Sequence, residues 1–136
     1  MSDPTEFLDL DDLLALAERL LGSAAPVRDV GLLGSAVARP QTTAFGVRRS
    51  AFGEDAYPDV WTKAAALLQS IVKDRPLVDG NKSLGWLATA VFLELNGVEA
   101  TAVGNDEVYE LVVMIAAGHH EVDEIAVMLR SAIEAS

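Results

Sequence analysis

The segment of residues 75–82, Arg-Pro-Leu-Val-Asp-Gly-Asn-Lys, holds residue types suited to binding a phosphate group. It leads directly into an apolar stretch, and if that stretch is a helix, its first amides lack intrahelical acceptors and point outward at the positive end of the helix dipole. Gly80 permits the backbone conformations that such a turn needs, and Lys82 adds a cation in the first turn. Asp79 adds one carboxylate, which suits Mg²⁺ shared with phosphate oxygens. The segment therefore predicts a phosphate site with a metal position beside it.

The same residues also have a purely structural interpretation, in which Asp79 and Asn81 cap the helix and Gly80 turns the chain. The distribution of charge favours a bound anion. Residues 28–82 carry eight basic and six acidic groups, a net charge of +2, although the whole chain has a net charge of −11. An acidic chain that gathers its cations in one stretch is expected to meet an anion there, unless the charges are simply scattered. The overall negative charge argues against direct DNA or RNA binding.

Six helices are predicted to position this segment. Apolar residues recur at helical spacing, and glycine, proline and aspartate mark the ends. The stretch that follows the phosphate segment is apolar on most sides, which predicts a buried central helix. The predicted helices span residues 10–21, 29–38, 59–74, 81–95, 105–118 and 123–133, with caps at Asp9 and Asn105, and residues 98–103 are a candidate strand without a partner. Residues 41–57 form a loop long enough to be functional.

Composition sets the class of protein. The 136 residues suit a single domain, 51% of them are hydrophobic, and the shortage of aromatic residues favours helices over a sheet. There is no cysteine, so disulfides and thiolate metal sites are excluded. The acidic N-terminus is unlike a signal peptide, and the longest apolar stretch is too short to span a bilayer. A cytoplasmic protein with no membrane partner is predicted.

Asp79-Gly80-Asn81-Lys82 followed by an apolar helix resembles the signature of the Fic/Doc superfamily, which in the Doc branch reads His-x-Phe-x-Asp-(Ala/Gly)-Asn-Lys-Arg. Residues 28–41, 57–68 and 92–97 are also similar to Doc sequences, and the likeness runs from about residue 7 to residue 129. The chain is identified as a member of the Doc (death-on-curing) toxin family. The resemblance implies one all-α domain over residues 1–136, a Fic/Doc-type bundle of about six helices around a buried central helix.

The resemblance also implies a function. Doc proteins are toxins of toxin–antitoxin pairs, and they move the γ-phosphate of ATP to a threonine of elongation factor Tu, which stops translation. Their Fic relatives transfer AMP instead. Asp79 would hold Mg²⁺, the phosphates of ATP would meet Gly80, Asn81, Lys82 and Ser83, and the loop of residues 41–57 would guide a protein substrate. The expected partner is a Phd-like antitoxin, whose disordered C-terminal segment folds as a helix into a groove on the toxin.

The sequence departs from the signature at two functional positions. Arg75 stands where the family has the histidine that acts as general base, and Ser83 stands where it has an arginine; Leu77 replaces the phenylalanine, a packing residue. Arginine stays protonated and only donates hydrogen bonds, so Arg75 cannot take the proton from a hydroxyl. A well-matched base contributes roughly 10²–10⁴-fold in rate, so its loss would weaken or silence the enzyme. Losing the arginine at Ser83 removes a bidentate phosphate clamp.

Three explanations follow: a Doc-like toxin of reduced or absent activity, a noncatalytic protein that binds a nucleotide, phosphate or partner, or a lethal enzyme disarmed by design. His119 and His120, the only histidines, are expected to be exposed loop residues, while Asp74 or a phosphate oxygen is the remaining candidate base. Trp61 and Trp86 are expected to pack in the core or at its edge, and Arg28 and Asp29 to pair or cap the second helix.

Overall fold

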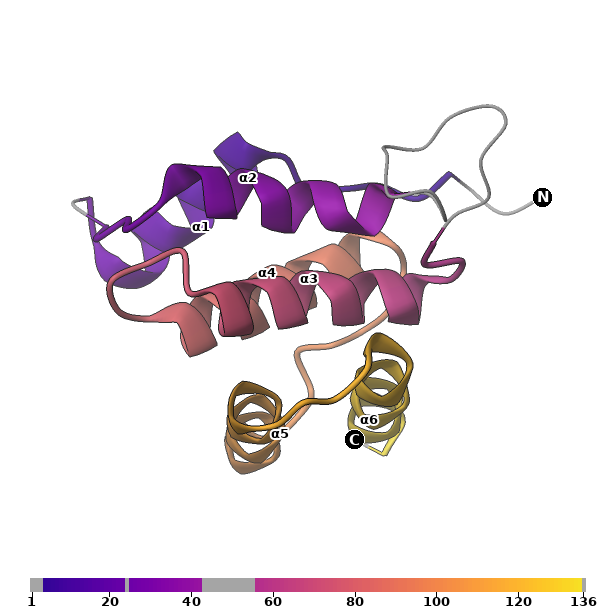
Figure 1. Ribbon diagram of the computed structural model, residues 1–136. Helices are drawn as coiled ribbons and strands as arrows, with labels where there is room; N and C mark the ends of the chain where they lie inside the picture. The colour runs from indigo at the N-terminus through magenta and orange to yellow at the C-terminus, as the bar shows by residue number, and fades with distance from the viewer. Residues whose placement is uncertain (1–3, 24, 43–55, 136) are drawn as a thin grey trace.

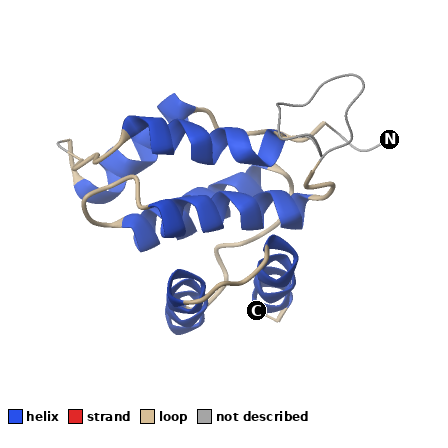
Figure 2. Ribbon diagram, viewed as in Figure 1, coloured by secondary structure: helices blue, strands red, loops and turns tan. Residues whose placement is uncertain are grey.

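The computed structural model describes residues 4–23, 25–42 and 56–135, and helices account for most of them (Figures 1 and 2). In chain order they are α1 (Leu10–Leu21), α2 (Val30–Ala38), the 3₁₀ helix η1 (Arg39–Gln41), α3 (Val60–Asp74), α4 (Asn81–Leu95), α5 (Asn105–Ala117) and α6 (Val122–Glu134). The described residues contain no strand, so the predicted all-α class is confirmed. Most of the predicted loop of residues 41–57 lies outside the described residues.

Aspartate side chains start three of the helices, because each accepts a hydrogen bond from an amide that the first turn leaves unpaired. Asp9 accepts from the amide of Asp12 at 2.8 Å, as predicted, and Asp29 and Asp59 do the same at the starts of α2 and α3. The predicted helices of residues 29–38 and 59–74 therefore begin one residue later than expected, because their first aspartate is the cap.

One predicted cap and one predicted helix start are wrong. Asn105 is the first residue of α5, the cap position belongs to Gly104, and no side chain caps this end. The last helix begins at Val122 rather than Asp123, because Glu121 and Glu124 bond reciprocally to each other's backbone amides.

The core lies around α3 and α4, which run side by side between a layer of α1 and α2 and a layer of α5 and α6 (Figure 1). Helix α3 packs against every other helix except α1, and ten of its fifteen residues are buried. Helix α4, predicted as the central one, has eight buried residues. Gly85 allows their close approach, since a Cβ atom there would lie 2.8 Å from Cγ2 of Val72. A single hydrophobic cluster takes residues from all six α-helices.

The candidate strand of residues 98–103 is wrong. The segment is irregular and turns back towards α5, and the amide of Ala100 is bonded to Oε1 of Glu94 at 2.9 Å instead of to a neighbouring strand. A strand needs a ladder partner, and none of the described residues supplies one here. Trp61 and Trp86 are half-buried against the core, as predicted. Among the described residues, no helix has the length and apolarity to cross a bilayer.

Candidate phosphate-binding site

The loop between α3 and α4 is held in place by the chain segment before α2. The amides of Arg28 and Asp29 donate to the carbonyl of Pro76 at 2.8 and 3.0 Å, and the amide of Val78 donates to the carbonyl of Pro26 at 2.7 Å. These bonds flank an antiparallel bridge between Val27 and Leu77. Segments about 50 positions apart in the sequence are thereby fixed to each other at the start of the site.

The side chain of Arg28 closes the end of α3. Its Nε donates to the carbonyl of Arg75 at 2.8 Å and its second terminal nitrogen donates to that of Asp74 at 2.7 Å. Cationic donors at a helix C-terminus satisfy carbonyls that the helix leaves free and oppose the dipole. Asp29 caps the second helix as expected, but Arg28 caps the far end of another helix, a contact that the sequence did not indicate.

Asn81 closes the loop from inside. Its side chain is buried, its Oδ1 accepts from the amide of Leu77 at 2.8 Å, and its Nδ2 donates to the carbonyl of Leu77 at 2.9 Å. Leu77 itself is almost fully buried, in keeping with a packing residue at the position where the signature has phenylalanine. The side chain of Asn81 therefore faces the interior of the loop. Only its backbone amide is left to bind a ligand at the start of α4.

The first turn of α4 has no side-chain cap. The carboxylate of Asp79 accepts from the amide of Gly80 at 2.9 Å, so the interpretation in which Asp79 and Asn81 cap the helix is wrong. Gly80 has φ of 87°, and a Cβ atom there would lie 2.9 Å from Cδ1 of Leu21, which explains the need for glycine. Within the described residues, the first amides of α4 are left without acceptors, as an anion site requires.

These amides face a cleft of about 410 Å³, within the usual size of ligand sites. Arg75, Asp79, Lys82 and Ser83 line it and are exposed, and Arg75 and Lys82 form no side-chain hydrogen bond or ion pair with the described part of the chain. Lys73 adds a third cation, whose Nζ donates to the carbonyls of Ala116 and Gly118 at 3.3 and 2.7 Å. The cleft thus combines free amides, three cations and one carboxylate.

The region around this cleft matches known proteins. The Fic/DOC family profile matches residues 7–93, which contain the loop and the first turn of α4. The chain is 44% identical over 126 residues to Toxin Doc of Mycolicibacterium smegmatis (strain ATCC 700084 / mc(2)155), and the match covers 92% of each protein. This chain belongs to the Fic/DOC family.

Arg75, which the sequence analysis placed at the histidine position of the signature, has a strained backbone. It caps the C-terminus of α3 at φ of 54° and ψ of 62°, the left-handed region that side chains other than glycine rarely adopt. Asparagine, aspartate and histidine tolerate this region better than most residues, so a histidine at this position would be less strained than Arg75. The guanidinium lies at the cleft but can only donate hydrogen bonds there.

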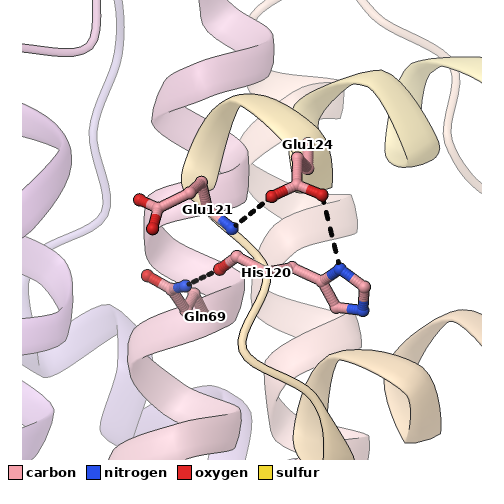
Figure 3. A network of polar contacts seen from close by, with 4 residues as sticks. All are labelled: Gln69, His120, Glu121 and Glu124. Carbon is pink, nitrogen blue, oxygen red and sulfur yellow. Dashed lines mark hydrogen bonds and ion pairs between the residues drawn. The ribbon is translucent and has the colours of Figure 1, made fainter.

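The two histidines lie between α5 and α6 and line a second cleft, of about 290 Å³, which meets the first at Lys73. His119 is exposed, as expected. His120 is partly buried: its Nδ1 lies 3.8 Å from Oε2 of Glu124, and its carbonyl accepts from Nε2 of Gln69 at 2.8 Å (Figure 3). Neither histidine lines the first cleft, which we call the phosphate cleft, so neither is placed to act as a base there.

The residues present suit one kind of metal ion. In the described part of the chain, no three side chains of histidine, cysteine, aspartate or glutamate gather into a closed metal site. Asp79 contributes a single exposed carboxylate at the cleft, with Oδ1 engaged by the amide of Gly80. Mg²⁺ commonly binds through one or two carboxylates, water and substrate phosphates, and Asp79 fits that arrangement.

Proposed function

We propose that this chain is a Doc-like toxin of a toxin–antitoxin pair, built to move the γ-phosphate of ATP to a threonine of elongation factor Tu and thereby stop translation. Membership of the Fic/DOC family and the similarity to a protein named Toxin Doc support this proposal. The observation that carries it is the uncapped start of α4, which faces a cleft with Arg75, Asp79 and Lys82 on its walls.

Each residue at the cleft has a role in this proposal. The amides of Asn81, Lys82 and Ser83 bind phosphate oxygens, helped by the charge of Lys82. Asp79 would hold Mg²⁺, which would neutralise negative charge on the phosphates. The Asn81 side chain acts indirectly, by keeping Leu77 and the loop in place. ATP supplies the transferable phosphoryl group.

Arg75 sets the level of activity. Its guanidinium binds phosphate but cannot accept the threonine proton, so a rate about 10²–10⁴-fold below that of a histidine enzyme is expected. Phosphoryl transfer depends mostly on positioning and charge, and the remaining groups at the cleft supply both. The proposed toxin is therefore a weakened phosphotransferase rather than a different kind of enzyme.

The test uses ATP labelled at the γ- or the α-phosphate, with Mg²⁺ and purified elongation factor Tu. The wild-type chain, Arg75→His and the double variant Arg75→His/Lys82→Ala are compared. We expect slow γ-label transfer by the wild type, faster transfer by Arg75→His, and loss in the double variant. Transfer of the α-label would make the chain an AMP transferase. No transfer by any variant would reject the elongation factor Tu assignment.

A noncatalytic protein is the second candidate, because the anion-binding features are present while Arg75 and Ser83 replace two functional residues. In that case ATP binds, but neither the wild type nor Arg75→His transfers label. In both cases we propose a Phd-like antitoxin as partner, with a disordered segment that folds on the toxin. Co-expression with a Phd-like antitoxin, followed by co-purification, tests that partner.

A further inference from the structure

The carboxylates near the phosphate cleft differ in how far their oxygens are already engaged. At the cleft itself, Oδ1 of Asp79 accepts from the amide of Gly80, and the same side chain is the proposed metal ligand. In the second cleft, Glu121 takes part in the reciprocal cap at the start of α6. The carboxylate of Asp74 is exposed and forms no hydrogen bond or ion pair with any residue that the structure describes. Asp74 therefore has both oxygens available as acceptors.

Asp74 lies between two hollows that each adjoin the phosphate cleft. One is the second cleft, which meets the phosphate cleft at Lys73. The other has a volume of about 380 Å³ and is lined by Asp74, Arg75, Arg28, Leu77 and Val78; we call it the side hollow. Arg75 lines both the side hollow and the phosphate cleft. A group in the side hollow can therefore approach both the carboxylate of Asp74 and the guanidinium of Arg75.

The backbone at Asp74 is fixed by Arg28. The guanidinium of Arg28 donates to the carbonyl of Asp74 at 2.7 Å and to that of Arg75 at 2.8 Å, so the carboxylate projects from a fixed point at the end of α3. A negative charge in the last turn of a helix is unfavourable for the helix dipole, which favours lysine or arginine there. Because the carboxylate does not benefit α3, its position favours a role at the site.

We propose that Asp74 is the general base of this enzyme, in place of the histidine that the family signature has at position 75. The inference rests on the phosphotransferase proposed above and adds the group that takes the proton. The hydroxyl of the acceptor threonine lies in the side hollow, between the carboxylate of Asp74 and the γ-phosphate that Arg75 binds. Two neighbouring residues thus divide the work, because the arginine only donates hydrogen bonds and the aspartate only accepts them.

The proton and the phosphoryl group move in one step. The hydroxyl oxygen forms a bond to the γ-phosphorus while the bond from that phosphorus to the β–γ bridging oxygen breaks, and ADP leaves. The hydroxyl proton passes to the carboxylate of Asp74, which releases it to water afterwards. Asp74 lines the adjoining hollows and not the phosphate cleft itself, so it reaches the hydroxyl less directly than a residue at position 75. This arrangement agrees with a weakened enzyme.

The first experiment measures γ-label transfer from ATP to elongation factor Tu by the wild type, Asp74→Asn, Asp74→Glu and Asp123→Asn. Asp123 is the matched control, an exposed aspartate on α6 that lines neither cleft nor the side hollow. Asp74→Asn should lower the rate about 10²-fold, the low end of what a positioned base contributes. Asp74→Glu should retain part of the activity, and Asp123→Asn should match the wild type. The Kd for ATP, measured by calorimetry, should be the same in all four proteins, because Asp74 acts on the acceptor.

The second experiment repeats Asp74→Asn in the Arg75→His background. With an imidazole at position 75, the hydroxyl proton has another acceptor, so Asp74→Asn should change this rate by less than about 2-fold. An equal loss in both backgrounds would overturn the inference, because Asp74 would then support the site without taking the proton. Circular dichroism checks that each variant is folded.

Other outcomes separate this inference from the function on which it rests. If the wild type transfers the γ-label and Asp74→Asn transfers it at the same rate, the inference is overturned while the phosphotransferase stands. A loss in His119→Ala instead would assign the proton to the imidazole in the second cleft, with the same consequence. If neither the wild type nor Arg75→His transfers label, the proposed function fails and the inference fails with it.

Discussion

Replacing Asn81 with alanine removes the two hydrogen bonds that hold Leu77 inside the loop. The side chain of Asn81 satisfies both the amide and the carbonyl of Leu77, at 2.8 and 2.9 Å, and no other described residue bonds to either group. Leu77 is almost fully buried, so its backbone groups have little access to replacement water. The variant therefore leaves one buried donor and one buried acceptor unpaired.

The cost follows from those two groups. An unsatisfied buried polar group costs about 1–3 kcal/mol, so two of them should lower the free energy of unfolding by roughly 2–6 kcal/mol. For a chain of this size, that corresponds to a loss of roughly 10 °C in Tm. Aspartate has nearly the same shape as asparagine, so Asn81→Asp keeps an acceptor for the amide of Leu77 but turns a carboxylate oxygen towards the carbonyl of Leu77. Near neutral pH this variant should be at least as destabilising as Asn81→Ala.

Urea denaturation followed by circular dichroism measures the change, with Lys82→Ala as the control. Lys82 is adjacent, exposed and unpaired within the described residues, so its removal should alter stability by less than about 0.5 kcal/mol. The same variants are then titrated with tripolyphosphate. A decrease below about 1 kcal/mol for Asn81→Ala would refute the reasoning, because it would mean that the loop keeps its form without the asparagine.

Two further predictions concern how the helices around the site are joined. Arg28→Ala should lower the free energy of unfolding by about 1 kcal/mol in denaturant titrations, because two carbonyls at the end of α3 lose a charged donor. Arg28→Lys should restore part of that stability. Equal stability of the wild type and both variants would contradict the capping role. Gly85→Ala should lower the Tm and reduce the free energy of unfolding by about 1–3 kcal/mol, because the new Cβ would meet Val72. Gly34→Ala in α2, where a Cβ would have no atom within 4 Å, should raise the free energy of unfolding by about 0.5–1 kcal/mol. Similar effects at both positions would argue against close packing of α3 on α4.

Part of the site could be predicted from local sequence. Gly80 and the apolar stretch after it indicate a turn into a helix, whatever surrounds them, because glycine conformation and helical periodicity act over a few residues. Helices α1 and α4 accordingly begin and end where the sequence placed them. The phosphate contacts, the metal role of Asp79 and the consequence of Arg75 stay predictions, because they depend on ligands.

Long-range contacts could not be predicted in this way. The sequence placed Arg28 at the second helix, but its guanidinium binds carbonyls 46 and 47 positions later. It also marked Asn81 as an outward ligand, although the fold turns its side chain towards Leu77. Lys73 carried no local signal for its bonds to the end of α5.

The sequence by itself determined the helices and the position of the phosphate loop, because hydrophobic periodicity, caps and glycine conformations are local properties. Only the tertiary structure decided which groups meet at the cleft. It left the first turn of α4 uncapped and kept both histidines out of the phosphate cleft. These features depend on how α1, α3, α4 and α5 pack, and packing is set by side chains far apart in the chain.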